Sequence, residues 1–176
     1  MFKILDEVCT PRRGTKYSAY VDLFAREDVV IGAGETKIVK LGVKLNIEML
    51  VYEYFSQLPF DYVIKNNINS ANDFLKSHYL EVALRSSLGV KGLIIANGIG
   101  IIDLDYPDEI GLIVHNPVDL NFICDYLANN DYKKYSNFEI KRGDKVAQCT
   151  LKEHKGYLMG FESDVVRTGG FGSTGN

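Results

Sequence analysis

Alternating apolar and polar residues fill much of this chain and predict strands. Residues Val29–Ile31 and Lys37–Ile47 follow a period of two and are separated by the turn sequence Gly32-Ala33-Gly34-Glu35. This pattern is typical of two strands in a half-buried antiparallel sheet. Further short runs of the same kind occupy residues Tyr79–Leu84, Leu93–Ala96, Ile110–His115 and Val146–Leu151. Many short strands separated by turn residues predict an all-β fold, a β-sandwich or barrel of the jelly-roll kind.

Two regions depart from this period and predict short helices inserted between strands. In residues Met49–Leu58 the apolar side chains gather on one helical face, and Ser70-Ala71-Asn72-Asp73 resembles a capping box that opens a second short helix through Leu75. Residues Leu120–Leu127 carry another apolar stripe after the candidate N-cap Asp119. We interpret residues 49–77 and 118–136 as insertions.

Length and composition limit the classes of protein that this chain can belong to. It has 176 residues, enough for one domain over 1–176, and 46% of them are hydrophobic. A net charge of -3, with basic residues only in short pairs, argues against a nucleic-acid surface. No run is long enough to span a membrane, so we expect no membrane association and a cytoplasmic location, in the host cytoplasm for a viral protein. The three cysteines, Cys9, Cys124 and Cys149, have no metal-site spacing and predict reduced, buried thiols.

The C-terminal run Gly169-Gly170-Phe171-Gly172-Ser173-Thr174-Gly175 is the first candidate site. Glycines let successive backbone N–H groups surround an anion, and the hydroxyls of Ser173 and Thr174 add donors. The run lacks the G-K-[ST] ending of a P-loop and opens no helix, which excludes a Walker-type site. A loose chain end is the alternative, and composition alone favours it. Phe171 fits that alternative poorly, because a ring among glycines suits stacking on a base.

Two internal motifs are also candidates for phosphate chemistry. In the stretch from Asn97 to Tyr106, apolar residues lead to Asp103, which could act as a general base on a water, and the glycines permit a tight hairpin. For Asp105 and Asp108, the pattern favours a plain β-turn with acidic caps over a functional role. In Arg85-Ser86-Ser87-Leu88-Gly89 a guanidinium and two hydroxyls suit phosphate oxygens, although Arg85 could equally form a structural salt bridge.

Five motifs in this order resemble those of the dUTP pyrophosphatase (dUTPase) family, a trimeric all-β family with a jelly-roll-like barrel. The matching segments are Ala19–Leu23, Arg85–Gly89, Gly100–Tyr106, Gly143–Gln148 and Gly169–Gly175. Outside the two insertions, the resemblance covers most of the chain from about Lys3. It implies conversion of dUTP to dUMP and pyrophosphate with Mg²⁺, in a homotrimer whose sites draw motifs from three subunits.

The resemblance also implies a role for each matching residue. Asp103 would be the base that activates water for attack on the α-phosphorus, and Tyr106 would pack under the deoxyribose. Asp22 would orient water around Mg²⁺, and Phe171 would stack on uracil in a flexible arm over 167–176. The other substrate-binding residues are those that would read uracil, Asn97, Gly98 and Ile102, and those that would hold or support the phosphates, Arg85, Ser86, Ser87, Gln148, Arg167, Gly172, Ser173 and Thr174.

The chain departs from the family pattern at three places. One residue fewer separates Arg167 from Phe171, Tyr20-Val21 replaces Gly-Tyr before Asp22, and the two insertions have no counterpart in compact members. The insertions are rich in aromatic residues and are either a self-packed surface cap or a surface for a protein partner.

Two rival functions remain open at this point. A dCTP deaminase-like enzyme shares the fold but would need an arginine where this chain has Val90 and a glutamate in the strand Gly111–His115. A catalytically silent dUTPase-like binding or regulatory protein would not need Asp103, Tyr106 or Phe171.

Overall fold

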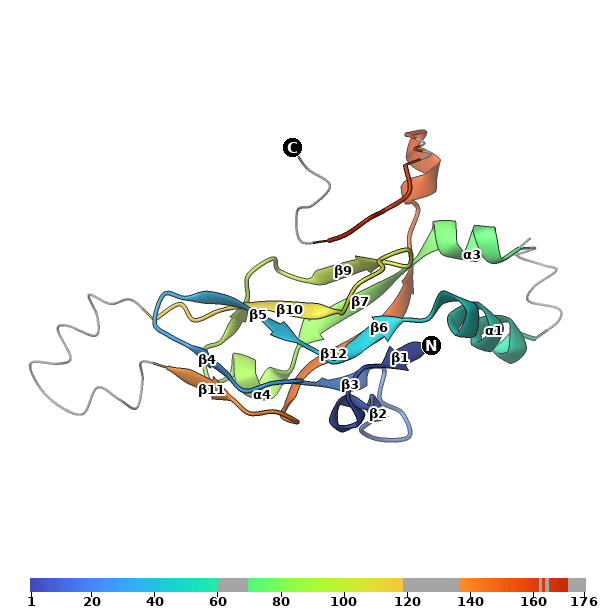
Figure 1. The fold of residues 1–176 in the computed structure, drawn as a ribbon. Helices are drawn as coiled ribbons and strands as arrows, with labels where there is room; N and C mark the ends of the chain where they lie inside the picture. Colours follow the sequence, from blue (N-terminus) through green and yellow to red (C-terminus); the bar gives the residue numbers. More distant parts are fainter. Residues whose placement is uncertain (60–69, 119–136, 162, 164, 171–176) are drawn as a thin grey trace, which may run out of the picture.

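A five-stranded antiparallel sheet runs through the centre of the molecule. The computed structural model describes residues 1–59, 70–118, 137–161, 163 and 165–170. The sheet has the order β2 (Arg12–Arg13), β3 (Val21–Phe24), β12 (Lys145–Glu153), β7 (His78–Leu84) and β9 (Gly100–Asp103). Figure 1 shows β7 and β12 as its long central members. Strands that are far apart in the sequence are therefore neighbours. The first, third and fourth motifs contribute strand residues to this one sheet, and the second motif follows directly after β7.

Smaller sheets complete the β-structure and confirm the all-β fold. One has three strands in the order β5 (Thr36–Lys40), β10 (Gly111–His115) and β8 (Ile94–Ile95). Two further pairs join β1 (Phe2–Ile4) to β6 (Val43–Leu45) and β4 (Val29–Ile31) to β11 (Phe138–Ile140). The predicted strands at 79–84, 93–96, 110–115 and 146–151 all appear, with shifted ends.

Side chains from these sheets share one hydrophobic core. On the five-stranded sheet, Leu23, Leu80 and Val82 point inward, and on the three-stranded sheet Val39, Leu112 and Val114 do the same. Residues at alternate positions, such as Glu81 on β7 and Ile113 on β10, face away from this core. The outward face of the five-stranded sheet is thus the face that carries Asp22, Gln148 and Asp103.

In the described part of the chain, three helices and two 3₁₀ turns flank the sheets. The helices are α1 (Ile47–Gln57), α3 (Ala71–Ser77) and α4 (Ser86–Gly89), and the 3₁₀ turns are η1 (Glu7–Cys9) and η2 (Gly156–Met159). Ser70 caps α3 by accepting a hydrogen bond from the Asp73 N–H at 3.1 Å, as the capping-box sequence predicts. The predicted helix at Leu120–Leu127, most of the second insertion and Cys124 lie outside the described residues.

An aromatic cluster joins α1 and α3 to the start of β7. The rings of Tyr54 and Phe74 lie 4.1 Å apart between centroids, and Phe74 lies 4.6 Å from the ring of His78. Phe55 packs against both Tyr54 and Phe74. The described part of the first insertion is therefore tied to the main sheet by a buried ring, because Phe74 is fully buried.

The structure corrects the predicted strand from Lys37 to Ile47. This segment forms two strands, β5 and β6, with a break between them. At the break the backbone bonds to Ile110: the Leu41 N–H donates to the Ile110 carbonyl at 3.0 Å, and the Ile110 N–H donates to the Val43 carbonyl at 2.9 Å. Ile47 already belongs to α1, because the Asn46 side chain caps that helix by accepting from the Met49 N–H. Nor do the two predicted strands pair with each other, since β4 pairs with β11 and β5 with β10.

After η2 the chain turns back over the main sheet, and Figure 1 shows this segment passing above β9. The described residues of this segment end at Gly170, and the arm residues Phe171, Gly172, Ser173 and Thr174 lie beyond them. Cys9 and Cys149 are free and buried, as predicted. None of the helices in the described part of the chain has the length and apolar character needed to cross a bilayer.

Candidate active site

Asp103 stands at the end of β9, where the strand leaves the sheet. Its side chain is exposed, whereas the ring of Tyr106, three residues later, is 6% exposed. The turn between them closes with a 3.0 Å hydrogen bond from the Tyr106 N–H to the Asp103 carbonyl. Burial raises the pKa of the Tyr106 hydroxyl. The turn thus places an accessible carboxylate beside a fixed, neutral aromatic ring.

A cavity of about 210 Å³ opens beside Tyr106. It is smaller than the roughly 300–1,000 Å³ typical of pockets for drug-sized ligands, so it suits a nucleoside better than a whole nucleoside triphosphate. The residues that line it come from β8, β9, β10, the turns beside them and the C-terminal segment, and they are Ile95, Asn97, Gly100, Ile101, Ile102, Tyr106, Gly111, Leu112, Ile113 and Arg167. Four predicted site residues, Asn97, Ile102, Tyr106 and Arg167, meet here.

The turn at Asn97 and Gly98 forms one side of this region. Gly98 has a positive φ of 75°, a conformation that glycine adopts without strain. Its N–H donates to the Ile95 carbonyl at 3.2 Å. The predicted tight hairpin is wrong in one respect, because β8 pairs with β10 and β9 pairs with β7, so the turn links two sheets. Its exposed backbone remains open to a ligand at the cavity.

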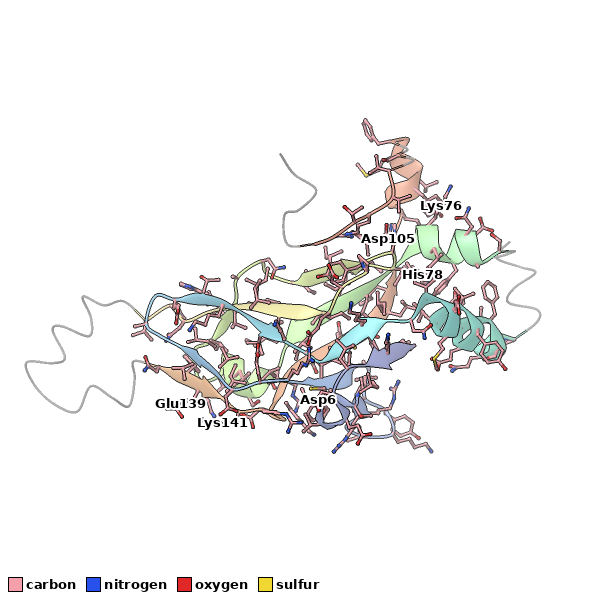
Figure 2. The ribbon with its side chains drawn as sticks, in the orientation of Figure 1. Asp6, Lys76, His78, Asp105, Glu139 and Lys141 are labelled. Atoms are coloured by element: carbon pink, nitrogen blue, oxygen red, sulfur yellow. The ribbon has the colours of Figure 1, made fainter. Side chains whose placement is uncertain are left out.

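Arg167 brings the C-terminal segment onto Asp103. Its Nη1 forms an ion pair with Oδ2 of Asp103 and lies 3.6 Å from Oδ1 of Asp105. Its guanidinium also lies 5.2 Å from the centroid of the Tyr106 ring. Figure 2 shows Asp105 below the returning C-terminal segment. In this structure Arg167 therefore contacts two carboxylates and the aromatic ring beside the cavity.

Asp22 and Arg85 form the centre of a second group of predicted residues. Nη1 of Arg85 pairs with Oδ1 of Asp22, and Nζ of Lys145 lies 3.1 Å from Oδ2. Asp22 is buried, while both cations are partly exposed. The salt bridge that the sequence left open for Arg85 is present.

Ser86 and Ser87 follow Arg85 in the sequence, and Gln148 lies beside Asp22 in the sheet. Both serines are exposed and open α4 immediately after Arg85, whose N–H donates to the Val146 carbonyl at 3.0 Å. Gln148 is half-buried on β12 and lies directly opposite Asp22 on β3. Two hydroxyls, an amide and a charged pair thus share one corner of the outward face of the sheet.

One chain does not bring these two groups together. Asp22 pairs through Gln148 with Ala83 on β7, and Asp103 pairs with Tyr79, four residues along the same strand. Four residues of strand span about 13 Å and three strand spacings about 14 Å, so Asp22 and Asp103 lie roughly 20 Å apart.

Four contacts in and near these groups, described next, were not predicted from the sequence. Lys145 reaches Asp22 next to a register shift between Lys145 and Ala147, and a bulge of this kind leaves no clear sequence signal. Asp105, explained above as a turn residue, contacts Arg167. The hydroxyls of Tyr20 and Tyr79 both donate to Glu81, and the hydrogen bond from Tyr20 lowers the pKa of that carboxyl.

The oxygen atoms near Asp22 determine whether Mg²⁺ can bind at this site. Among the described residues, no three His, Cys, Asp or Glu side chains are grouped to hold a metal ion. Oδ2 of Asp22 is buried and lies 3.1 Å from Nζ of Lys145, so it offers no open position for direct contact with a metal ion. Mg²⁺ usually retains several waters and binds substrate phosphates, so these residues fit an ion that contacts the protein through water.

The features required for a deaminase are missing at the corresponding positions. Val90 follows α4 and is 89% exposed, with no guanidinium to offer. Strand β10, which is described over its whole length, reads Gly111-Leu112-Ile113-Val114-His115 and has no carboxylate.

Sequence comparison identifies relatives that share one name. No protein-family model matches the chain. Deoxyuridine 5′-triphosphate nucleotidohydrolase of Nautilia profundicola is 29% identical over 180 residues, which cover 98% of this chain and 95% of the relative. The enzyme of the same name from Rickettsia akari is 28% identical over 172 residues, or 94% of this chain and 87% of the relative.

Structural comparison finds the same fold. A variant of the dUTPase from phage phi11 of S. aureus superposes with a TM-score of 0.58 at 20% identity, covering 98% of both chains. That structure is described as showing how a structural Mg(II) ion is coordinated.

Proposed function

We propose that this chain, as a member of the dUTPase family, hydrolyses dUTP to dUMP and pyrophosphate. The observation that carries the proposal is the position of Asp103, an exposed carboxylate at the end of β9 beside a nucleoside-sized cavity. The ordered motifs and the shared name of the sequence relatives support the same reaction.

The cavity would hold the nucleoside part of the substrate. Tyr106 presents a buried ring on which a deoxyribose can pack, and a fixed ring at this position would collide with a 2′-hydroxyl. Asn97, with its amide donor and acceptor, and the exposed backbone from Gly98 would pair with the uracil edge. Ile102 would supply apolar contact from the wall of the cavity.

Asp103 would act as general base. It would take a proton from a water while the water oxygen bonds to the α-phosphorus and the bond to the bridging oxygen breaks, so that pyrophosphate leaves with the electron pair. The proton would then pass from Asp103 to solvent. Mg²⁺ bound to the phosphates would neutralise charge, and Asp22 would orient one of its waters. Ser86, Ser87 and Gln148 would hold the phosphate oxygens, with Arg85 holding Asp22 in place.

In a homotrimer, the Asp103 group of one chain could lie close to the Asp22 group of another. Within one chain the Asp103 and Asp22 groups are too far apart for the base to act on an α-phosphate held by Gln148. Assembly of three copies would place the phosphate group of one chain beside the cavity of another, and the arm residues Phe171, Gly172, Ser173 and Thr174 would close over the substrate.

The reaction is tested by incubating the protein with Mg²⁺ and either dUTP or dCTP and measuring pyrophosphate and ammonia. We expect pyrophosphate from dUTP, its loss on chelation of the metal, at least a thousandfold loss in Asp103→Asn, and a steep loss when residues 171–176 are removed. Asp108→Asn is the matched control, because this exposed carboxylate lies in the same turn and outside the lining of the cavity. Ammonia from dCTP, or no turnover of either nucleotide, would contradict the proposal.

The shared site has its own test. Asp103→Asn and Gln148→Ala chains carrying different tags are co-expressed, and mixed oligomers are isolated on both tags. If each site combines Asp103 of one chain with Gln148 of another, the mixture regains activity that neither variant has alone. A monomer on light scattering, or mixed oligomers without recovery, would contradict the shared site.

A further inference from the structure

We propose that Arg12 binds the terminal phosphate of the nucleotide and makes the site prefer a triphosphate to a diphosphate. The inference rests on the proposed function and deepens it, because it names the group that recognises the end of the phosphate chain. It is carried by the position of Arg12 beside Asp22 and by the contact of its guanidinium with Phe24.

Arg12 belongs to a row of polar residues that crosses three neighbouring strands. It lies directly opposite Asp22 on β3, and Asp22 lies directly opposite Gln148 on β12. Residues that face each other across antiparallel strands project from the same side of a sheet, so all three side chains are on the outward face. Two strand spacings make the row about 10 Å long. Arg12 is at its outer end, because β2 is the edge strand in the described sheet (Figure 1).

The ring of Phe24 holds the head of Arg12 on this face. The guanidinium carbon lies 5.4 Å from the centroid of the ring. Phe24 follows Asp22 by two residues and therefore shares its side of β3, at a diagonal distance that a long side chain can span. It is only 4% exposed although it does not belong to the hydrophobic core between the sheets, so side chains of the outward face, Arg12 among them, cover it.

The charge of Arg12 is left for a ligand. Its guanidinium forms no ion pair or hydrogen bond with the described residues, whereas Arg85 and Lys145 are both paired with Asp22. Three cations thus meet one carboxylate, and this group of four side chains has an excess of two positive charges. The ring covers one face of the guanidinium and leaves the N–H groups at its edge open, in the planar arrangement that binds two phosphate oxygens at once.

The order of the residues in the row assigns Arg12 to the terminal phosphate. In the proposed reaction Gln148 holds the α-phosphate, at the end of the row that lies nearer the centre of the sheet. A phosphate chain that extends along the row from Gln148 passes Asp22 and the magnesium water that it orients, and ends at Arg12. A nucleoside diphosphate has one phosphate fewer and ends before the guanidinium. Arg12 therefore distinguishes dUTP from dUDP.

Calorimetric titration with Mg²⁺ tests the contact, using dUMP and the non-hydrolysable α,β-imido analogues of dUTP and dUDP. Arg12→Gln should bind the dUTP analogue about tenfold or more weakly, because a hydrogen bond between charged groups is lost, while affinity for the dUDP analogue and dUMP changes less than about threefold. Arg12→Lys should recover part of the loss, since lysine binds phosphate as a point charge. Lys3→Gln is the matched control, because it removes the same charge from an exposed position on β1. Equal melting temperatures would show that all variants fold.

Three results of this experiment would overturn the proposal. Unchanged affinity of Arg12→Gln for the dUTP analogue would show that the arginine does not contact phosphate, and equal losses for both analogues would place the contact on an inner phosphate. An equal loss in Lys3→Gln would assign the effect to net charge. Turnover by the wild-type protein and its loss in Asp103→Asn test the proposed function separately. Without that turnover both ideas fail, whereas turnover together with an unaffected Arg12→Gln variant removes this inference alone.

Mixed oligomers test whether Arg12 acts together with Gln148 of its own chain. Arg12→Gln alone should raise KM for dUTP by about tenfold and leave kcat within about threefold. In oligomers with Asp103→Asn chains, an intact Asp103 can meet an intact Arg12 from the other chain, so part of the activity should show the wild-type KM. In oligomers with Gln148→Ala chains, each intact Gln148 belongs to a chain that lacks Arg12, so KM should stay raised. Absence of the wild-type KM from the first mixture, or its presence in the second, would refute the inference.

Discussion

Gly170 lies so close to Tyr106 that a side chain cannot fit between them. A Cβ at position 170 would be 2.1 Å from Cε2 of the ring and 2.9 Å from its hydroxyl oxygen. The ring cannot move aside freely, because it is buried. The absence of a side chain at residue 170 is thus what lets the C-terminal segment lie on the cavity wall and bring Arg167 to Asp103.

We therefore expect Gly170→Ala to lift this segment off the ring. The displaced Arg167 becomes more accessible, so trypsin should cleave after Arg167 at least several times faster, as followed by mass spectrometry, and kcat/KM for dUTP should fall about tenfold or more. Gly32→Ala is the control, since its added Cβ would lie 3.4 Å from its nearest neighbour, an ordinary contact. Unchanged cleavage after Arg167 in Gly170→Ala would contradict the close packing.

A second prediction concerns the aromatic cluster that ties the first insertion to the sheet. Phe74 is fully buried against Tyr54, Phe55 and His78, so Phe74→Ala should lower the free energy of unfolding by about 3–5 kcal/mol. Tyr52→Ala, on the exposed side of α1 with 76% of its surface accessible, should change it by less than about 0.5 kcal/mol. Urea denaturation at one fixed chain concentration measures both, and similar losses in the two variants would show that α1 and α3 do not pack as described.

The same cluster predicts a pH dependence of stability. Burial lowers the pKa of His78, an effect that the nearby Phe74 carbonyl and Glu153 only partly offset. In the unfolded chain His78 takes up a proton near its ordinary pKa of about 6.5, whereas in the folded chain it does so only at lower pH. The contribution of neutral His78 to the free energy of unfolding is therefore fully present above about pH 6.5 and is lost as the pH falls. Between about pH 6.5 and 5 we expect a decline of up to about 1.4 kcal/mol per pH unit.

His78→Gln isolates this contribution. Hydrogen bonding lowers the pKa of Asp6, Asp28, Glu35 and Glu81, so these carboxylates lose their contribution only at lower pH. Thermal melts from pH 7 to 5 should therefore be flatter for His78→Gln than for the wild type. Parallel curves would assign the decline to other groups.

The sequence predicted local features of the fold better than long-range pairing. The Ser70–Asp73 cap was readable because it lies within four residues, and the structure confirms it. The break between β5 and β6 was not readable, because it depends on hydrogen bonds to Ile110, a residue that the chain meets much later. Alternation alone cannot distinguish one long strand from two short ones on either side of such a contact.

In the candidate site, too, the sequence predicted local groupings better than contacts between distant residues. Asp103, Tyr106 and Asn97 lie within ten residues, and they gather beside one cavity because β9 and the turns at its two ends are consecutive in the sequence. The pairing of Lys145 with Asp22 depends on a strand bulge, and that of Arg167 with Asp105 depends on the return of the C-terminal segment. Neither has a local signal. The roles of these side chains in binding and catalysis stay predictions until the variants are measured.

The two partners of the ion pair between Arg85 and Asp22 are unequally buried, and we expect their removal to have unequal effects on stability. The Asp22 side chain is 4% exposed and that of Arg85 is 31% exposed. Removing the arginine leaves a buried carboxylate whose one remaining ion-pair partner among the described residues is Lys145, whereas removing the carboxylate charge leaves a guanidinium that can turn toward water. Breaking a buried pair costs most when the group left behind cannot be solvated.

Arg85→Met should therefore lower the free energy of unfolding by about 3 kcal/mol and Asp22→Asn by only about 1–2 kcal/mol, and the double variant should lose less than the sum of the two. Lys145→Met should cost less than about 1 kcal/mol, because its ammonium is half-exposed. Urea denaturation at constant chain concentration measures all four variants, since association would otherwise change the apparent stability. If Asp22→Asn proved the more damaging of the two single changes, Asp22 would have to be stabilised by partners other than Arg85, and Arg85 would then be free to bind substrate phosphate directly.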